Sequence, residues 1–134
     1  MQPNEFLQCR TIAVAGASAD PSKYGNIVFR RLVASGRTVF AINPKGIEIE
    51  GHRSYRSLRD LPVVPEAVSI VTPPMVTRMV VADAIAVGVR SLWMQPGAED
   101  PIAGQSAIDA GLSVIDDGSC ILVALAVESA RAGT

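Results

Sequence analysis

The sequence lacks the features that mark several large protein classes. It has no uninterrupted apolar run long enough to cross a membrane and no block of basic residues. Its formal net charge of −1 and its pI of about 5.8 argue against nucleic acid as a partner. The stretch from Met1 to Phe6 lacks the cationic start and apolar core of a signal peptide. We therefore expect a cytoplasmic protein with no membrane and no nucleic acid among its partners.

Cysteine and histidine are scarce, which limits metal and catalytic chemistry. The two cysteines, Cys9 and Cys120, have neither the spacing of metal ligands nor that of a disulfide framework, which suggests reduced thiols. His52 is the only histidine, has no carboxylate beside it in the sequence and is expected at the surface. Asp116 and Asp117 have two interpretations, a cation site and capping of the last helix, and capping is the simpler one. The sequence therefore predicts no metal site and no enzymatic reaction.

Aromatic residues are also few, at 4%, although 49% of the residues are hydrophobic. The core must therefore consist mainly of valine, isoleucine, leucine and alanine, a composition typical of strands that are buried on both faces. The length of 134 residues suits one domain, residues 1–134. Trp93, on an apolar segment, is expected in the core, and Phe6 and Leu7 are expected to pack onto the domain from a short N-terminal turn.

Apolar segments and amphipathic segments alternate along the chain. Five strands are predicted at residues 11–15, 38–42, 67–71, 90–94 and 112–115. Helices are predicted at residues 25–35, from 74 to about 87, from 101 to about 110 and at 119–132, and residues 47–61 are expected to be irregular. This alternation predicts an α/β fold of the Rossmann-like, doubly wound type. We expect a mostly parallel five-stranded sheet of order 3-2-1-4-5 with helices on both faces.

Four loops should meet at the carboxyl edge of this sheet, where such folds bind ligands. The first contains Gly16 and Gly25, with Ser18 and Ser22 as hydroxyl donors and Lys23 as a cation between them. Gly16 leaves room where a ligand approaches the backbone, and the N-terminus of the next helix offers N–H groups to an anion. The spacing departs from the dinucleotide fingerprint G-x-G-x-x-G. A long phosphate-binding loop is therefore predicted.

The second strand ends in Asn43-Pro44-Lys45. NAD-binding domains usually place a carboxylate here to bind the adenosine ribose. A lysine instead favours a nucleotide that carries a phosphate on this ribose, so NADP or coenzyme A fits better than NAD. The alternative is a solvated surface lysine without a ligand.

Five blocks along the chain carry a resemblance to a known family. They are Val14–Ser18 with Asp20–Asn26, Ile42–Lys45, Tyr55–Leu58 with Leu61-Pro62, Val71–Pro74, and Trp93–Gly97. Together they resemble the stand-alone CoA-binding domain family, which is similar to the N-terminal domain of the alpha subunit of succinyl-CoA synthetase. The resemblance covers about residues 6–120 and implies binding of the ADP half of coenzyme A in a Rossmann-type cleft. It implies a site made of Gly16, Ala17, Ser18, Lys23, Tyr24, Gly25, Asn26, Asn43, Pro44, Lys45, Thr72, Pro73, Pro74 and Gln95.

The resemblance also assigns roles within this site. The first loop and residues 24–26 would hold the diphosphate, Lys45 would meet a phosphate, and residues 72–74 would line the adenine. Gln95 would lie at the mouth where the pantetheine arm leaves. The synthetase's phosphorylated histidine lies in a later domain that this sequence does not contain.

One segment departs from the family pattern. The family tends to show an Asp-Arg-Cys run followed by Glu, whereas this chain has Asp116-Asp117-Gly118-Ser119-Cys120. Cys120 has two interpretations: a thiol that forms a mixed disulfide with the coenzyme, or a buried structural cysteine.

The predicted function is a small, non-catalytic module that binds coenzyme A or an acyl-CoA. Two alternatives stay open: an NADP-binding subunit of an oxidoreductase, and a nucleotide-sensing interaction protein. The sequence identifies no protein partner.

Overall fold

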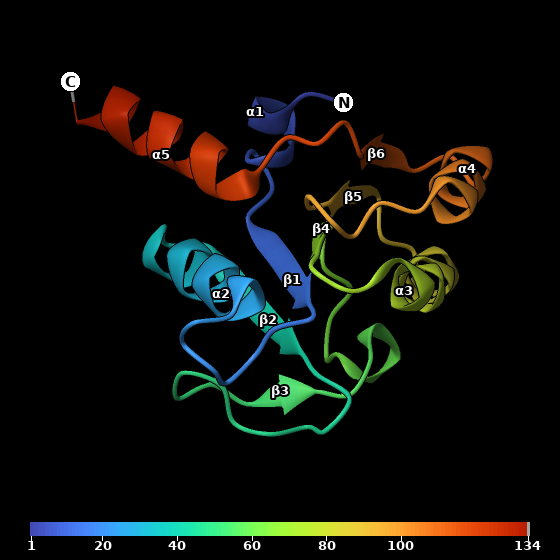
Figure 1. Cartoon of the computed structure of the whole chain (residues 1–134), viewed down its shortest axis with the longest axis horizontal. Coiled ribbons are helices and arrows are strands. Elements are labelled where there is room, and N and C mark those ends of the chain that lie inside the picture. The colour runs from blue at the N-terminus through green and yellow to red at the C-terminus, as the bar shows by residue number, and fades with distance from the viewer. Residues whose placement is uncertain (134) are drawn as a thin grey trace.

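The computed structural model describes residues 1–133, and its strands form one six-stranded sheet in which every pairing is parallel (Figure 1). The strand order is β3-β2-β1-β4-β5-β6. The strands are β1 (Thr11–Ala15), β2 (Thr38–Ile42), β3 (Ser54–Tyr55), β4 (Ala67–Ile70), β5 (Ser91–Met94) and β6 (Ser113–Ile115).

The predicted α/β, doubly wound fold is confirmed, and the strand count is one too low. The missed strand is β3, a two-residue edge strand within the segment that we expected to be irregular. Its register pairs Ser54 with Ala41 and Tyr55 with Ile42. The predicted order 3-2-1-4-5 placed residues 67–71 beside residues 38–42, and this placement is wrong, because β3 takes that position. The strand at residues 67–70, numbered third from the sequence, is the fourth strand and lies beside β1.

Helices cover both faces of the sheet (Figure 1). One face carries α1 (Pro3–Phe6), α2 (Tyr24–Ala34) and α5 (Ile121–Ala132). The other carries α3 (Pro74–Val87), α4 (Pro101–Asp109) and the 3-10 turn η1 (Leu58–Asp60). This two-sided cover agrees with the prediction and is the arrangement that right-handed crossovers produce in a parallel sheet.

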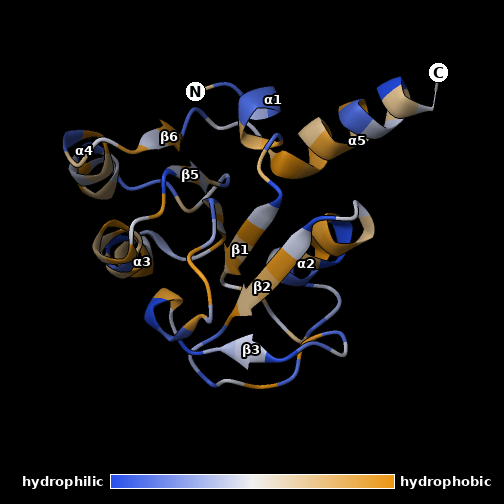
Figure 2. Ribbon diagram, turned by 180° about the vertical axis from the view of Figure 1, so that it is seen from behind, coloured by the Kyte–Doolittle hydropathy of each residue, from blue (hydrophilic) through white to orange (hydrophobic). Residues whose placement is uncertain are grey.

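The core consists of two aliphatic layers, one on each side of the sheet. Along β1, Ile12 and Val14 face the α2 side, whereas Ala13 and Ala15 face the α3 side, and all four are buried. Figure 2 shows β1 and β2 as mostly hydrophobic ribbons and β3 as a much paler one. The central strands are therefore hydrophobic on both faces, as buried parallel strands must be.

The N-terminal turn packs onto the first layer, as the sequence predicted. Phe6 and Leu7 are buried, and the Phe6 ring meets the buried Trp93 ring edge-on at 5.2 Å between centroids. Trp93 is thus a core residue.

Within residues 1–133, no helix is both long enough and apolar enough to cross a membrane.

Candidate functional site

The carboxyl ends of the strands bring five connections to one edge of the sheet. The β1–α2 loop (residues 16–23) and the β2 turn (residues 43–46) lie on one half of this edge. The β5–α4 loop (residues 95–100) and the β6–α5 loop (residues 116–120) lie on the other half. The β4–α3 loop (residues 71–73) stands between them, because β1 and β4 are neighbours. Strand order reverses between β1 and β4, and doubly wound sheets bind ligands at such a reversal.

Gly16 is where the two loops at this reversal touch. It has φ of +90°, and a Cβ built on it would lie 2.0 Å from the Val71 carbonyl oxygen. Gly25, at the start of α2, faces Gly16 in turn, because its Cβ would lie 2.0 Å from the Gly16 carbonyl oxygen. Both glycines are thus required for close contacts within the protein. The ligand approach that we expected at Gly16 would be a second reason for a glycine there.

Two asparagine side chains brace the β1–α2 loop from outside. The fully buried Asn26 donates from Nδ2 to the Ser18 carbonyl over 2.8 Å, and Asn43 donates from Nδ2 to the Ala17 carbonyl over 2.9 Å. Arg30 extends the brace by donating from Nε to Asn26 Oδ1 over 2.6 Å. Asn26 and Asn43, both predicted site residues, therefore position the loop through their amides.

The braced loop leaves a set of backbone donors without an acceptor. Within residues 1–133, the N–H groups of Ala17, Ser18 and Ala19, and those of Tyr24 and Gly25 at the start of α2, donate to no protein atom. Asparagine amides hold the neighbouring carbonyls, so hydrogen bonds among residues 1–133 fix the loop conformation without using these donors. Such a set of free N–H groups beside a helix N-terminus is an anion-binding arrangement.

The middle of the loop carries one acid. Asp20 accepts hydrogen bonds from the backbone N–H of Ser22 at 2.9 Å and from its hydroxyl at 2.7 Å. These two bonds hold the pKa of the Asp20 carboxyl below its usual range. The Asp20 N–H donates to Ser18 Oγ over 3.1 Å. Both predicted hydroxyl donors, Ser18 and Ser22, are thus engaged within the loop, and the exposed Lys23 follows them.

The β2 turn presents Lys45 at the same half of the edge. Its backbone N–H donates to Asn43 Oδ1 over 2.9 Å, and the Gly46 N–H donates to the Asn43 carbonyl over 2.9 Å. Asn43 therefore holds both its own turn and the β1–α2 loop. Pro44 and Lys45 are exposed, and Lys45 has no carboxylate within 4.0 Å among residues 1–133.

The β4–α3 loop is tied to the other half of the edge. Thr77 Oγ1 donates to the Ala98 carbonyl over 2.8 Å and lies 2.8 Å from Thr72 Oγ1. Pro73 and Pro74, at the N-cap and the first turn of α3, are exposed. Asp100 caps α4 by accepting from the Ala103 N–H.

Asp100 also binds Arg78 of α3 through two hydrogen bonds of 2.9 and 3.1 Å. The Arg78 guanidinium and the Ala103 N–H together hold the pKa of the Asp100 carboxyl below its usual range.

Gln95 does not occupy the mouth position that we expected. It is fully buried, and its Oε1 accepts the Ile121 N–H at the start of α5 over 2.9 Å. Its Nε2 donates to Ser69 Oγ over 3.2 Å. Gln95 thus satisfies the N-terminus of α5, and the expectation that Asp116 and Asp117 cap this helix is wrong. Asp117 instead accepts from the N–H and hydroxyl of Ser119, and α5 begins at Ile121.

Tyr24 joins the two halves of the edge. Its hydroxyl lies 2.6 Å from Cys120 Sγ and 3.4 Å from Gln95 Oε1. Partial burial and the hydrogen bond with Cys120 raise the pKa of the Tyr24 hydroxyl. Cys120 is half-buried, a position between the two that we considered for it.

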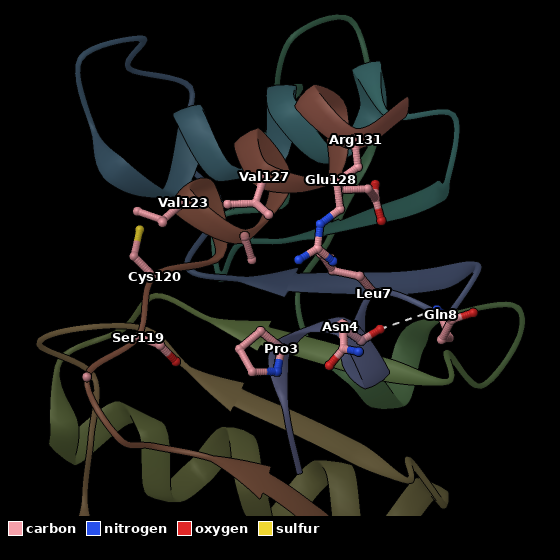
Figure 3. Close-up of a pocket in the computed structure, with 12 residues that line it drawn as sticks. Pro3, Asn4, Leu7, Gln8, Ser119, Cys120, Val123, Val127, Glu128 and Arg131 are labelled. Atoms are coloured by element: carbon pink, nitrogen blue, oxygen red, sulfur yellow. Dashed lines mark hydrogen bonds between the residues drawn. The ribbon is translucent and has the colours of Figure 1, made fainter. Parts of the chain in front are cut away.

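A separate hollow of about 860 Å³ lies between α1 and α5 (Figure 3). Val123 and Val127 of α5 line it from one side, and Pro3 and Leu7 from the other. Cys120 lies at one end, and none of the predicted site residues lines it. Outside the strand edge, His52 is exposed as expected and stacks edge-on against Phe29 at 5.3 Å. Among the described residues, no cluster of histidine, cysteine and acidic side chains has the geometry of a metal site.

Comparison with known proteins identifies related chains. A family model described as a CoA binding domain matches residues 10–126. The alpha subunit of an ADP-forming acetate–CoA ligase II from Pyrococcus furiosus is 32% identical over 88 residues. This match covers 65% of the present chain and 19% of the ligase subunit, so the chain spans only a small part of that relative.

Solved structures are similar over most of the fold. A conserved hypothetical protein from Pyrococcus furiosus is 41% identical with a TM-score of 0.79, covering 85% of this chain and 97% of that one. Acetyl-coenzyme A synthetase 1 from Ca. Korarchaeum cryptofilum, in complex with phosphate and ADP, is 28% identical with a TM-score of 0.73. That match covers 81% of this chain and 26% of the synthetase.

Proposed function

The chain belongs to the CoA-binding domain family, and we propose that it binds coenzyme A or an acyl-CoA through the ADP half, as a module without a reaction of its own. The observation that carries this proposal is a set of N–H groups with no acceptor in residues 1–133, those of Ala17, Ser18, Ala19, Tyr24 and Gly25. These donors fit a diphosphate, and their loop is already held by Asn26 and Asn43. A ligand that meets a preformed loop does not have to order it, which favours affinity.

Lys45 supports a ligand with a phosphate on the adenosine ribose. It follows β2, the strand whose end lies beside this ribose in doubly wound nucleotide-binding folds. A free ammonium group at this place attracts a phosphate, whereas NAD-binding domains carry an acid there. Coenzyme A therefore suits the site better than NAD.

The side chains along the edge support binding without catalysis. Asp20 is an ionised acceptor occupied by Ser22, and Gln95 is buried under α5. The single histidine, His52, pairs with Ile49 across a tight turn, and its ring packs edge-on against Phe29. No nucleophile, base and orienting group are paired among these residues as a reaction would require.

Isothermal titration of the protein with coenzyme A, acetyl-CoA, NADP and NAD in parallel tests the proposal. We expect saturable binding of coenzyme A and acetyl-CoA and none of NAD. Binding of NADP alone would replace this proposal with the oxidoreductase-subunit alternative. Binding of none of the four would refute it.

A further inference from the structure

Arg56 lies beside Lys45 because of the strand that the sequence did not reveal. It directly follows β3, and β3 pairs with β2, so the residues after both strands share one end of the sheet. The Arg56 Nη1 group donates to the Pro44 carbonyl over 3.0 Å. The arginine also lies against Gly46, since a Cβ there would be 3.4 Å from both Cγ and Nε of Arg56. The guanidinium is thus held at the β2 turn from two directions.

Neither cation at this turn has a counter-ion. Among residues 1–133, Arg56 and Lys45 have no carboxylate within 4.0 Å. Two acids of the same segment have other partners: Glu50 faces Arg30 at 3.7 Å, and Asp60 accepts from the Ser57 hydroxyl. Arg56 is exposed, and in the described part of the chain the Pro44 carbonyl is the only acceptor for its five side-chain N–H groups. Two uncompensated positive charges therefore flank one peptide unit.

Two other exposed arginines of the fold pair with carboxylates. Arg59 contacts Asp83 at 2.7 Å, and Arg78 contacts Asp100 at 2.9 Å, so each joins two elements through a carboxylate. Arg56 has no such partner, although its position is fixed. A fixed guanidinium with free donors beside a free ammonium group matches a dianionic phosphate, which a planar fork can bind through two parallel hydrogen bonds.

We propose that Arg56 is a second phosphate-binding residue that acts with Lys45 on the phosphate of the adenosine ribose, so that the pair selects coenzyme A over nucleotides without that phosphate. This inference rests on the proposed function, because it assigns a further residue to the same ligand. It also predicts that adenosine 3′,5′-bisphosphate, which lacks the pantetheine arm, binds on its own.

The test is titration of Arg56→Gln with coenzyme A, dephospho-coenzyme A and adenosine 3′,5′-bisphosphate. We expect Arg56→Gln to lose about tenfold in affinity for the two ligands with the ribose phosphate, as removal of one hydrogen bond to a charged group does. Affinity for dephospho-coenzyme A should change less than about twofold, because the lost contact is absent from that complex. Arg31→Gln is the matched control: it removes one exposed positive charge on α2 and should leave all three affinities unchanged.

Salt dependence separates ligand contact from a purely structural role. Binding of coenzyme A to the wild type should weaken as ionic strength rises, and Arg56→Gln should show a shallower dependence. An arginine that only holds the β2 turn would lower the affinity for all three ligands alike and leave the salt dependence unchanged. That result, or an unchanged affinity for coenzyme A, would overturn the inference.

Arg56→Lys covers the case in which Arg56→Gln does not fold. Lysine keeps the charge and should keep the preference for coenzyme A over dephospho-coenzyme A, and loss of this preference would contradict the inference. The proposed function fails separately, when the wild type binds neither coenzyme A nor its dephospho form. Binding of the bisphosphate alone would then still support the Arg56–Lys45 pair.

Discussion

The two halves of the strand edge handle their polar groups in opposite ways. On the half formed by the β1–α2 loop and the β2 turn, several backbone donors have no acceptor within residues 1–133, and neither Lys45 nor the adjacent Arg56 has a counter-ion there. On the half formed by the β5–α4 and β6–α5 loops, Gln95, Asp100 and Asp117 are each bonded within the protein. Among residues 1–133, the first half thus carries cations without a counter-ion, whereas these three side chains of the second half bond within the protein.

This difference separates binding groups from supporting ones. Polar groups inside proteins are normally paired, so donors that are left unpaired at a fixed position call for an external acceptor. Those on the first half belong to the β1–α2 loop and the start of α2, at the edge where doubly wound sheets bind ligands. On the second half the same kinds of residue are used to attach α4 and α5 to the sheet. Residue type alone does not show which polar groups bind a ligand and which support the fold, whereas their hydrogen-bond partners do.

The largest expected effect comes from displacing the β1–α2 loop of the first half. In Gly25→Ala the added Cβ would meet the Gly16 carbonyl oxygen at 2.0 Å, so α2 and the loop must separate. We expect a loss of about 1–3 kcal/mol in the free energy of unfolding, the usual range for overpacking. Coenzyme A binding should disappear, because the free N–H groups no longer converge. Urea unfolding and calorimetric titration measure the two effects.

Gly104→Ala is the matched control for this variant. Gly104 is a buried helical glycine whose Cβ would meet only the Asp116 Oδ2 atom at 3.0 Å, the end of an exposed side chain that can turn away. The helix gains about 1 kcal/mol from alanine, which offsets the crowding. Retained coenzyme A binding in Gly25→Ala would mean that the β1–α2 loop is not where the diphosphate binds.

Reversing the charge at Lys45 tests the first half of the edge through its proposed contact with the ribose phosphate. Lys45→Glu should weaken binding of coenzyme A by roughly 1–3 kcal/mol, the value of a charge-assisted contact, and binding of dephospho-coenzyme A far less. Arg90→Glu makes the same change of charge before β5, at the opposite edge of the sheet, and should affect neither ligand. Parallel titrations of both variants decide the matter. Equal losses for both ligands in Lys45→Glu would refute contact between Lys45 and the ribose phosphate.

Most of the sheet could be predicted from the sequence, but its edge strand could not. The five longer strands were predictable because residues such as Ile12 to Ala15 are buried on both faces and form apolar runs. β3 was not, because it has two residues, Ser54 and Tyr55, and exists only through pairing with β2. The position of Arg56 depends on that pairing, so it was missed together with the strand.

The site itself was predictable as a set of loops and only partly as a set of roles. The chain order alone places Gly16, Lys45 and Thr72 at one edge. The direction of a side-chain amide depends on what lies above it, however. Asn26 turns to the loop carbonyl, and Gln95 turns to the Ile121 N–H, 26 residues further along the chain. No local pattern contains that information.

Gln95 tests the second half of the comparison. Gln95→Leu leaves the buried Ile121 N–H without its acceptor, which should cost about 1–3 kcal/mol in the free energy of unfolding. Because the side chain is fully buried, the folded variant should bind coenzyme A with an affinity within about threefold of the wild type, a change of under 1 kcal/mol. Denaturant unfolding and titration give both numbers, and Gln105→Leu on the exposed face of α4 is the control. A variant with unchanged stability and much weaker binding would move Gln95 to the ligand-contacting group.

Acid titration gives the smallest expected effect and compares one carboxylate from each half. Asp20 and Asp100 both have a pKa below the usual value in the folded protein, through Ser22 and through Arg78 respectively. Each therefore stabilises the fold above the pKa of its unfolded form, near 4, and this contribution is lost as pH falls through the folded pKa. Among the residues that the structure describes, Asp20 bonds only within its own loop, whereas Asp100 joins α3 to α4 across 22 residues.

Asp100→Asn should consequently flatten the decline of unfolding free energy between pH 6 and about pH 2.5 more than Asp20→Asn does, as chemical unfolding at a series of pH values would measure. The lost ion pair should also make Asp100→Asn less stable than the wild type at pH 6, with the two converging in acid. A larger flattening in Asp20→Asn would contradict the assignment of structural support to the second half, because the local loop acid would then stabilise the fold more than the acid that connects two helices.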